Sequence, residues 1–359
     1  MKVGILLGNI SESGGTERAV SNLANILVQF GNYEVNIISE YSSENDKAYY
    51  KLEDSIKVVH LGFQRTSIVH RLFSYKQLQD KLSKIISTFR LDALVGTTHA
   101  YNCIISRLHD QCLTVGCEHM NYQACKTFWR AIRKHCYPRL SAVVVLTNKD
   151  SQNYSFVQKG RLFVIPNSLS FTNDKIAQLE NHTILAVGRL CEQKDFSKII
   201  EVAEIVRHEL PDWKFKIFGD GPDKDKLENE IFENNLQGYV TIYPPTKTII
   251  NEYASSSMLA VTSRWEGFSM VILEAEACGL PIVSFNCNYG PSDLVDDGDN
   301  GFLIAPGDIH DFAEKVIKLA TDKNRRQKMG RNSFERSKNY TPAKVYEKWN
   351  DLFDQISNL

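Results

Sequence analysis

The sequence predicts an α/β protein built from two doubly wound domains, each a parallel sheet with helices on both faces. Two observations carry this prediction: short runs rich in Val and Ile alternate with segments of helical periodicity, and the alternation restarts near residue 183. The length of 359 residues agrees with roughly two domains and an ample core. Hydrophobic residues make up 43% of the chain and charged residues 24%, a globular composition that excludes disordered and fibrous proteins.

The first alternating series occupies residues 1–168, which form the first predicted domain. It opens with a buried strand at residues 2–8, and apolar side chains then recur at helical spacing over residues 17–30. Further strands are predicted at residues 34–39, 93–96, 114–117 and 142–146, a strand end followed by a turn within residues 163–168, and a long helix at residues 74–89.

The second series occupies residues 169–341, after a polar boundary within residues 165–182. Its strands are predicted at residues 183–188, 214–218, 240–243, 258–261 and 281–284. Residues 342–359 lie beyond this series and form a predicted amphipathic helix, whose apolar face carries Val345, Trp349, Leu352, Phe353 and Ile356.

Charge is divided unequally between the two halves. The whole chain has a formal net charge of −1, which excludes a strongly basic nucleic-acid-binding protein. Residues 1–170, however, hold 20 Lys and Arg against 13 Asp and Glu, and the remainder is acidic. This asymmetry predicts two bodies with different partners.

Cysteine usage and the start of the chain predict a cytoplasmic location. The first apolar run is too short for a signal peptide, and no run reaches the roughly 18 apolar residues of a membrane helix. The eight cysteines include no Cys-x-x-Cys pair, so we expect reduced thiols and no zinc site.

The loops that follow strands are where chemistry is expected in such sheets. After the first strand, Gly14 and Gly15 precede a helix whose free N–H groups suit an anion, although a plain turn explains two glycines equally well. No Gly-x-Gly-x-x-Gly occurs there, which disfavours NAD and FAD.

Two further loops follow strands of the second half. Arg189 and Lys194 could clamp a diphosphate, with solvated surface cations as the alternative. Gly219 and Asp220 begin a Gly-Asp-Gly-Pro turn that could approach a nucleotide closely, which by itself is a weak indication.

The segment 263–281 carries the most specific pattern. Glu266 and Glu274 are eight residues apart, about two helical turns, and the amides of residues 267–270 would open a helix. Carboxylates bind vicinal hydroxyls well, so the pair could address one polar ligand. In the alternative, Glu266 and Glu274 both lie on a solvated face of the helix. Glu276 is two residues from Glu274 and therefore on another side of the helix, and we expect it to be solvated.

Two features of the first half bear on a second ligand. His119 follows a strand and could hydrogen-bond a sugar or shuttle a proton, although a structural role is the commoner one for a single histidine. Residues 126–139 interleave cations with aromatics, so Arg130, Arg133 and Lys134 could face an anionic membrane or an acceptor diphosphate. The alternative is a helix that packs Phe128, Trp129 and Ile132 inward.

Together these motifs resemble those of the GT-B glycosyltransferases of family 4, which are retaining enzymes that use nucleotide sugars. The matching motifs, in order, are Gly-Gly-Thr-Glu, Gly-Arg-x4-Lys, Gly-Asp-Gly-Pro and Glu-Gly-Phe-x5-Glu. The resemblance covers nearly the whole chain and looks closest to bacterial members that extend lipid-linked oligosaccharides, O-antigens or capsules. It implies two Rossmann-like domains facing across a cleft, acceptor on the first and nucleotide sugar on the second, with the C-terminal helix crossing back onto the first.

The resemblance also assigns roles to individual residues. Arg189 and Lys194 would hold the diphosphate, and Glu274 the ribose hydroxyls. The donor sugar and distal phosphate would be held by Glu266 and by the amides of Phe268, Ser269 and Met270, while Gly15 would touch the donor phosphate and His119 would lie by the donor sugar. Pro245 departs from the family pattern, because it has no N–H to pair with the base, which leaves its carbonyl or its neighbours for that task.

The expected reaction is transfer of a hexose or N-acetylhexosamine from a UDP-sugar to a hydroxyl of a lipid-linked glycan, with retention of configuration. The leaving phosphate would take the acceptor proton, so no metal or other cofactor is expected. Two Asp-x-Asp pairs, Asp223/Asp225 and Asp297/Asp299, lie in polar turns and are interpreted as solvated. A nucleotide-sugar epimerase and a non-catalytic sugar-nucleotide-binding subunit are the rival hypotheses, and the intact set of charged motif residues argues against both.

Overall fold

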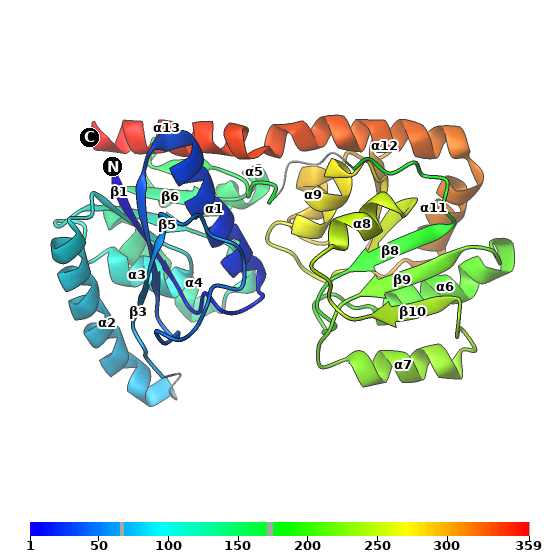
Figure 1. Ribbon diagram of the computed structural model, residues 1–359, viewed down its shortest axis with the longest axis horizontal. Helices are drawn as coiled ribbons and strands as arrows, with labels where there is room; N and C mark the ends of the chain where they lie inside the picture. Colours follow the sequence, from blue (N-terminus) through cyan, green and yellow to red (C-terminus); the bar gives the residue numbers. More distant parts are fainter. Residues whose placement is uncertain (65–67, 171–174, 359) are drawn as a thin grey trace. The chain divides into compact units, whose positions relative to one another are not determined.

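The computed structural model describes residues 1–64, 68–170 and 175–358 (Figure 1). The chain divides into two compact units, residues 1–170 with 341–359 (unit 1) and residues 171–340 (unit 2). Each unit contains one wholly parallel sheet, which confirms the predicted α/β class with two doubly wound halves.

Unit 1 is built on a seven-stranded sheet in the order β3-β2-β1-β4-β5-β6-β7. The strands are β1 (Lys2–Leu7), β2 (Glu34–Ser39), β3 (Lys57–His60), β4 (Ala93–Gly96), β5 (Leu113–Cys117), β6 (Ala142–Val145) and β7 (Leu162–Val164). The helices are α1 (Gly15–Gly31), α2 (Ile68–Phe89), α3 (His99–Ile105), α4 (Thr127–Cys136), α5 (Asn148–Ser151) and α13 (Pro342–Ser357), with 3₁₀ turns η1 (Tyr122–Ala124), η2 (Tyr137–Arg139) and η3 (Gln152–Tyr154).

Successive residues of the strands in unit 1 enter two different cores. Val3, Ile5 and Leu7 of β1 pack with α1, whereas Leu6 packs with α2 and α3 on the other face. Side chains alternate across a strand, so a sheet covered on both faces needs apolar residues at nearly every position. This requirement explains why the central strands are rich in Val, Ile and Leu on both faces.

The last helix of the chain belongs to unit 1. The apolar residues of α13 lie in the same core as β1 and α1, and Tyr346 stacks on Phe30 of α1 with 5.8 Å between ring centroids. The helices α1 and α13 lie side by side in Figure 1 although they are at opposite ends of the chain. The side chains on the predicted apolar face are all buried: Val345, Trp349, Leu352, Phe353 and Ile356.

Unit 2 is built on a six-stranded sheet in the order β10-β9-β8-β11-β12-β13. The strands are β8 (Thr183–Val187), β9 (Lys214–Phe218), β10 (Val240–Tyr243), β11 (Met258–Val261), β12 (Ile282–Phe285) and β13 (Gly301–Ile304). The helices are α6 (Ser197–Glu209), α7 (Lys224–Glu233), α8 (Ile249–Ala254), α9 (Met270–Ala277), α10 (Pro291–Leu294), α11 (Ile309–Thr321) and α12 (Lys323–Ser337), followed by the 3₁₀ turn η4 (Lys338–Tyr340).

Two strands were not predicted from the sequence. The four residues of β3 form an edge strand that is only half-buried, so its apolar pattern is weak. The strand β13 begins at Gly301, where a Cβ atom would lie 2.3 Å from the carbonyl oxygen of Ile282. Gly301 is needed because the two strands approach closely at this position. In the sequence, a glycine at the start of a strand is instead interpreted as a turn residue.

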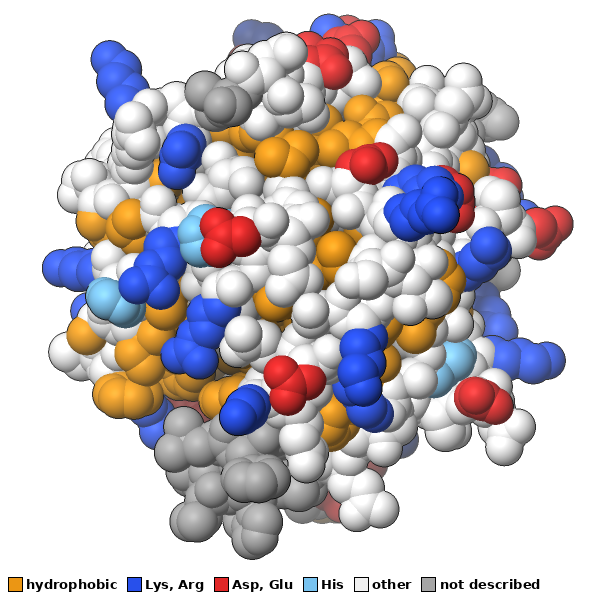
Figure 2. All heavy atoms as spheres, turned by 90° about the vertical axis from the view of Figure 1, so that its left-hand side faces the viewer, with side chains coloured by type: hydrophobic (Ala, Val, Ile, Leu, Met, Phe, Trp, Pro, Cys, Tyr) orange, Lys and Arg blue, Asp and Glu red, His pale blue; other side chains and the backbone are white. Residues whose placement is uncertain are grey.

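The thiols and the surface agree with an ordinary folded protein. No cysteine is disulfide-bonded within the part of the chain that the structure describes. Among the same residues, no helix is long and apolar enough to cross a membrane. Figure 2 shows a face of the molecule on which Lys and Arg are spread out and interspersed with Asp and Glu.

Candidate active site

The predicted motif residues of unit 2 follow three neighbouring strands. The loops after β9, β8 and β11 leave the carboxyl edge of the sheet, where ligands bind in parallel sheets. They contain Gly219, Arg189 with Lys194, and Glu266 respectively. The topology therefore brings motifs that are distant in sequence to one edge of one sheet.

The centre of this edge is a charged pair, Lys194 and Glu266. The Lys194 Nζ atom lies 2.6 Å from Oε1 of Glu266, and the two side chains are only 17% and 6% exposed. The hydroxyl of Ser263 donates to the same oxygen at 2.7 Å. These side chains are not solvated surface charges, which removes the alternative interpretation of Lys194 and Glu266.

The two loops that carry this pair are fastened to each other. The Thr262 hydroxyl donates to the carbonyl oxygens of Lys194 and Asp195 at 3.1 Å each, and Nε of Arg264 contacts the Asp195 carboxylate at 2.7 Å. The backbone amide of Arg264 also donates to the Gln193 carbonyl at 2.8 Å. The position of the Lys194 ammonium group is thus set by the backbone of both loops.

Glu274 lies inside helix α9 and is 1% exposed. The hydroxyl of Tyr253 in α8 donates to its Oε2 at 3.1 Å. Glu266 lies in the loop before α9 rather than on the helix, because the helix begins only at Met270. Glu266 thus precedes the helix, as expected if the amides of residues 267–270 open it, and the burial of both carboxylates rules out the alternative of a solvated helix face.

Residues 268–270 join Glu266 to the helix. Phe268, Ser269 and Met270 are all buried, and Ser269 is the residue that precedes the first helical turn. The buried hydroxyl of Ser269 has no hydrogen-bond partner among the described residues. The first N–H groups of a helix have no acceptor within the helix, so this turn can receive an anionic or hydroxyl ligand.

Arg189 differs from Lys194 in its environment. Its side chain is exposed and makes no ion pair with the residues that the structure describes. Its loop is held at Leu190, whose amide donates to the Asp220 carbonyl at 2.9 Å. The guanidinium group can therefore move toward an incoming phosphate without first leaving a partner.

The Gly-Asp-Gly-Pro turn packs tightly on the Arg189 loop. A Cβ atom on Gly219 would lie 2.0 Å from the Gly188 carbonyl oxygen, and one on Gly221 would lie 2.3 Å from that of Leu190. Close packing of two loops accounts for both glycines, while Asp220 is exposed. Pro245 is also exposed, in the loop after β10, where its carbonyl remains available as an acceptor.

In unit 1, Gly15 is the first residue of α1. A Cβ atom there would meet nothing within 4 Å, so the fold itself does not require glycine at this position. The space that a Cβ atom would occupy is open, so a ligand could approach the backbone closely there.

His119 follows β5 and is partly buried. Its Nδ1 atom is buried and has no hydrogen-bond partner in the described part of the chain. Burial lowers the pKa of its imidazole to about 4, so the ring is neutral near pH 7. A neutral imidazole can position a hydroxyl group, but it carries no proton to donate as a strong acid.

We expect the His119 ring to stay neutral down to pH 5 in the folded protein. Because its folded pKa lies below the ordinary value of about 6.5, its contribution to stability falls as the pH drops from about 6.5 to about 4. NMR titration of the histidine ring resonances, assigned with His119→Gln, measures this directly. A ring that titrates near 6.5 would show that His119 is exposed to solvent.

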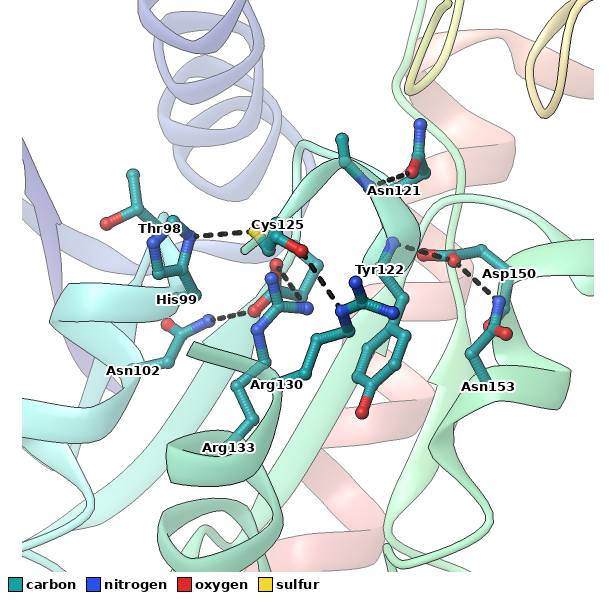
Figure 3. Close-up of polar contacts among 12 residues, drawn as sticks. Thr98, His99, Asn102, Asn121, Tyr122, Cys125, Arg130, Arg133, Asp150 and Asn153 are labelled. Atoms are coloured by element: carbon teal, nitrogen blue, oxygen red, sulfur yellow. Dashed lines mark hydrogen bonds and ion pairs between the residues drawn. The ribbon is translucent and has the colours of Figure 1, made fainter. Parts of the chain in front are cut away.

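The basic segment of unit 1 contains one buried cation. Arg133 is fully buried in α4, with NH1 3.7 Å from the Glu118 carboxylate and 3.1 Å from the Tyr154 hydroxyl. Asn102 and Tyr137 also donate to Glu118. Figure 3 shows Arg133 and Asn102 converging below the loop that carries Cys125.

The prediction that Arg133 faces a membrane or an acceptor diphosphate is therefore wrong. Its charge is committed to a buried carboxylate, since an unpaired carboxylate in the core would be strongly unfavourable. Phe128, expected to pack inward in the alternative, is instead 69% exposed. Arg130 is half-buried and donates to the Cys125 carbonyl, whereas Lys134 is exposed.

Glu276 was expected on a solvated face and is instead fully buried. It accepts a hydrogen bond from Nδ2 of Asn300 at 2.7 Å, and burial raises the pKa of its carboxyl well above the usual range. Nearly every residue of helix α9 is buried, whichever side of the helix it occupies. The helical spacing between Glu276 and Glu274 therefore could not show whether Glu276 is solvated or in the core.

Comparison with known proteins shows what this chain is similar to. The sequence model of the family described as "Glycosyl transferases group 1" matches residues 171–336. The chain is 29% identical to the amylovoran biosynthesis glycosyltransferase AmsD of Erwinia amylovora, over 98% of this chain and 99% of that protein. It is 27% identical, over 100% and 99%, to a Campylobacter jejuni N-acetyl-D-galactosaminyltransferase whose name specifies a PP-undecaprenol-linked glycan.

Solved structures show the same fold. Anabaena HepE in complex with UDP has a TM-score of 0.80 at 18% identity, covering 99% of this chain and 100% of that one. S. aureus TarM has a TM-score of 0.80 at 16% identity, covering 98% and 99%. The chain therefore has the GT-B fold, as the sequence resemblance implies, and in sequence it is similar to bacterial glycosyltransferases.

Proposed function

We propose that this protein is a retaining, family 4 glycosyltransferase of bacterial surface-polysaccharide assembly. It moves a hexose or N-acetylhexosamine from a UDP-sugar to a hydroxyl of a lipid-linked glycan. The observation that carries the proposal is the buried Lys194–Glu266 pair at the sheet edge that also carries Arg189. The names of the Erwinia and Campylobacter relatives support a polysaccharide product and a lipid-linked acceptor.

Unit 2 supplies the donor site in this proposal. Lys194 and Arg189 bind the diphosphate and stabilise the negative charge that grows as the bond between the sugar C1 and the phosphate oxygen breaks. Glu274 accepts hydrogen bonds from the ribose hydroxyls. Glu266 and the amides of residues 268–270 hold the sugar and the distal phosphate.

The chemical step needs no enzymatic nucleophile. The acceptor oxygen bonds to C1 on the face from which the phosphate leaves, and the departing phosphate oxygen takes the acceptor proton. The neutral ring of His119 suits hydrogen bonding to the sugar or the acceptor in this scheme better than proton donation. We assign no resident metal, because Lys194 and Arg189 carry the positive charge that the leaving group requires.

Unit 1 supplies the acceptor side. Arg130 and Lys134 remain as cations for an anionic membrane or an acceptor diphosphate, and Arg133 does not take part. A location at the inner face of the cell membrane follows from a lipid-linked acceptor.

NMR of donor turnover tests the proposal. Transferases cleave their donor slowly onto water when no acceptor is present, so the protein is incubated with UDP-glucose, UDP-galactose, UDP-GlcNAc or UDP-GalNAc in EDTA. We expect one donor to be consumed, with release of the α-anomer before mutarotation. Release of the β-anomer contradicts retention, a change of sugar configuration without UDP release indicates an epimerase, and no turnover of any donor favours a non-catalytic subunit.

Replacing Gly15 tests the role proposed for the first loop. We expect Gly15→Ala to leave the melting temperature unchanged or slightly raised, because the methyl group meets no atom and alanine favours a helix. Affinity for UDP should fall about tenfold, as the methyl group occupies space that the phosphate needs. Calorimetric titration with UDP measures this, and unchanged affinity would leave Gly15 as a turn residue only.

A further inference from the structure

Tyr253 is a buried residue that no motif includes. It lies in α8, its side chain is fully buried, and its hydroxyl donates to Oε2 of Glu274 at 3.1 Å. A buried hydroxyl and a buried carboxylate each need a partner, since neither is hydrated. The contact joins α8 to α9, two helices on either side of β11 in the sequence.

This contact bears on the orientation of the Glu274 carboxylate. The terminal torsion of a glutamate is broad, so the plane of the carboxylate is set by its hydrogen bonds rather than by rotamer preference. A donor held rigidly in the core and bonded to Oε2 restricts that rotation. Vicinal hydroxyl groups require a carboxylate in one particular plane if both are to donate to it.

We propose that Tyr253 is a positioning residue for ribose recognition, acting through Glu274. It fixes the carboxylate in the plane that accepts both vicinal hydroxyls, and so contributes to the preference for a ribonucleotide over a deoxygenated one. This inference rests on the proposed function and deepens it, because it explains how one carboxylate reads a diol.

The substitution Tyr253→Phe removes the hydroxyl and keeps the ring in the core. Affinities of the wild type and the variant for UDP and for 2′,3′-dideoxy-UDP are measured by calorimetry. We expect the wild type to prefer UDP by about 10- to 100-fold, as for hydrogen bonds to a charged group. In Tyr253→Phe this preference should fall at least threefold, while affinity for the dideoxy nucleotide changes less than twofold.

A matched control separates positioning from general loss of a buried hydroxyl. Tyr239 is also buried in unit 2, and its hydroxyl donates to the Leu210 carbonyl at 3.0 Å. Tyr239→Phe should lower stability in the same way and leave the preference for UDP unchanged.

Two results overturn the inference and are distinguishable from each other. If Tyr253→Phe weakens both nucleotides by the same factor, or leaves the preference intact, Tyr253 is merely structural. If the wild type binds neither UDP nor its dideoxy analogue, the proposed donor site itself is wrong.

Discussion

Lys194→Ala and Arg189→Ala should each lower kcat by about 30- to 1000-fold while changing KM for the UDP-sugar much less. Both cations are assigned to charge that grows as the diphosphate leaves, so they act in the transition state more than in the bound donor. Removal of one such electrostatic contact costs about 2–4 kcal/mol. Donor turnover followed by UDP release measures the effect.

The two variants should differ in stability, because the two side chains differ in environment. Lys194 is paired with buried Glu266, so its loss leaves a buried carboxylate without its cation and lowers the melting temperature. Arg189 is exposed, so its loss should leave the melting temperature unchanged.

Lys198→Ala is the control for the loss of a lysine near the site. Lys198 lies in the first turn of helix α6 and pairs with Glu201 on the surface, and its removal should change kcat less than twofold. Near-normal turnover in both Lys194→Ala and Arg189→Ala would contradict the assignment of the diphosphate to this sheet edge.

Arg133→Met should destabilise unit 1 by about 3–5 kcal/mol, the usual cost of removing one partner of a buried ion pair. Arg133 is fully buried and Glu118 is 2% exposed, so the carboxylate cannot recover hydration after the change. Methionine nearly fills the space of the arginine stem, which limits the contribution of a cavity to the loss. Chemical denaturation followed by circular dichroism measures the change.

The neighbouring residue on the same helix provides a matched control. Lys134 is exposed, so Lys134→Met should change stability by no more than about 0.5 kcal/mol. The double variant Glu118→Gln with Arg133→Met should recover part of the loss, because no buried charge is then left unpaired. Equal effects of Arg133→Met and Lys134→Met would contradict the buried pair.

The fold was predictable because parallel sheets covered on both faces leave a clear pattern. The strands β2, β9 and β11 consist mostly of buried residues, and the sequence predicted each of them with the bounds that the structure shows. The edge strand β3 was missed because only part of it is buried, and β13 because Gly301 reads as a turn residue when its strand contact is unknown.

The places of Lys194 and Glu266 in the fold were predictable because each follows a strand of the parallel sheet, and that of Glu274 because it lies in the helix after β11. Arg133 and Glu276 were misassigned because sequence shows a charge without showing its partner, here Glu118 and Asn300. Arg133 lies three and four residues before the buried Cys136 and Tyr137, and this helical spacing was the one sign in the sequence that its side chain is buried. Nothing in the sequence indicates a role for Tyr253, because that role depends on a contact between two helices.

Nucleotide binding tests the central claim most directly, which is that unit 2 holds a uridine diphosphate sugar. The purified protein is screened by thermal shift against UDP, GDP, ADP, CMP and a set of UDP-sugars, with and without EDTA. We expect stabilisation by UDP and by one UDP-sugar, unaffected by EDTA and lost in Glu274→Ala. A preference for GDP would contradict the donor assignment and direct attention to the loop at Pro245, and no shift with any nucleotide would contradict the site itself.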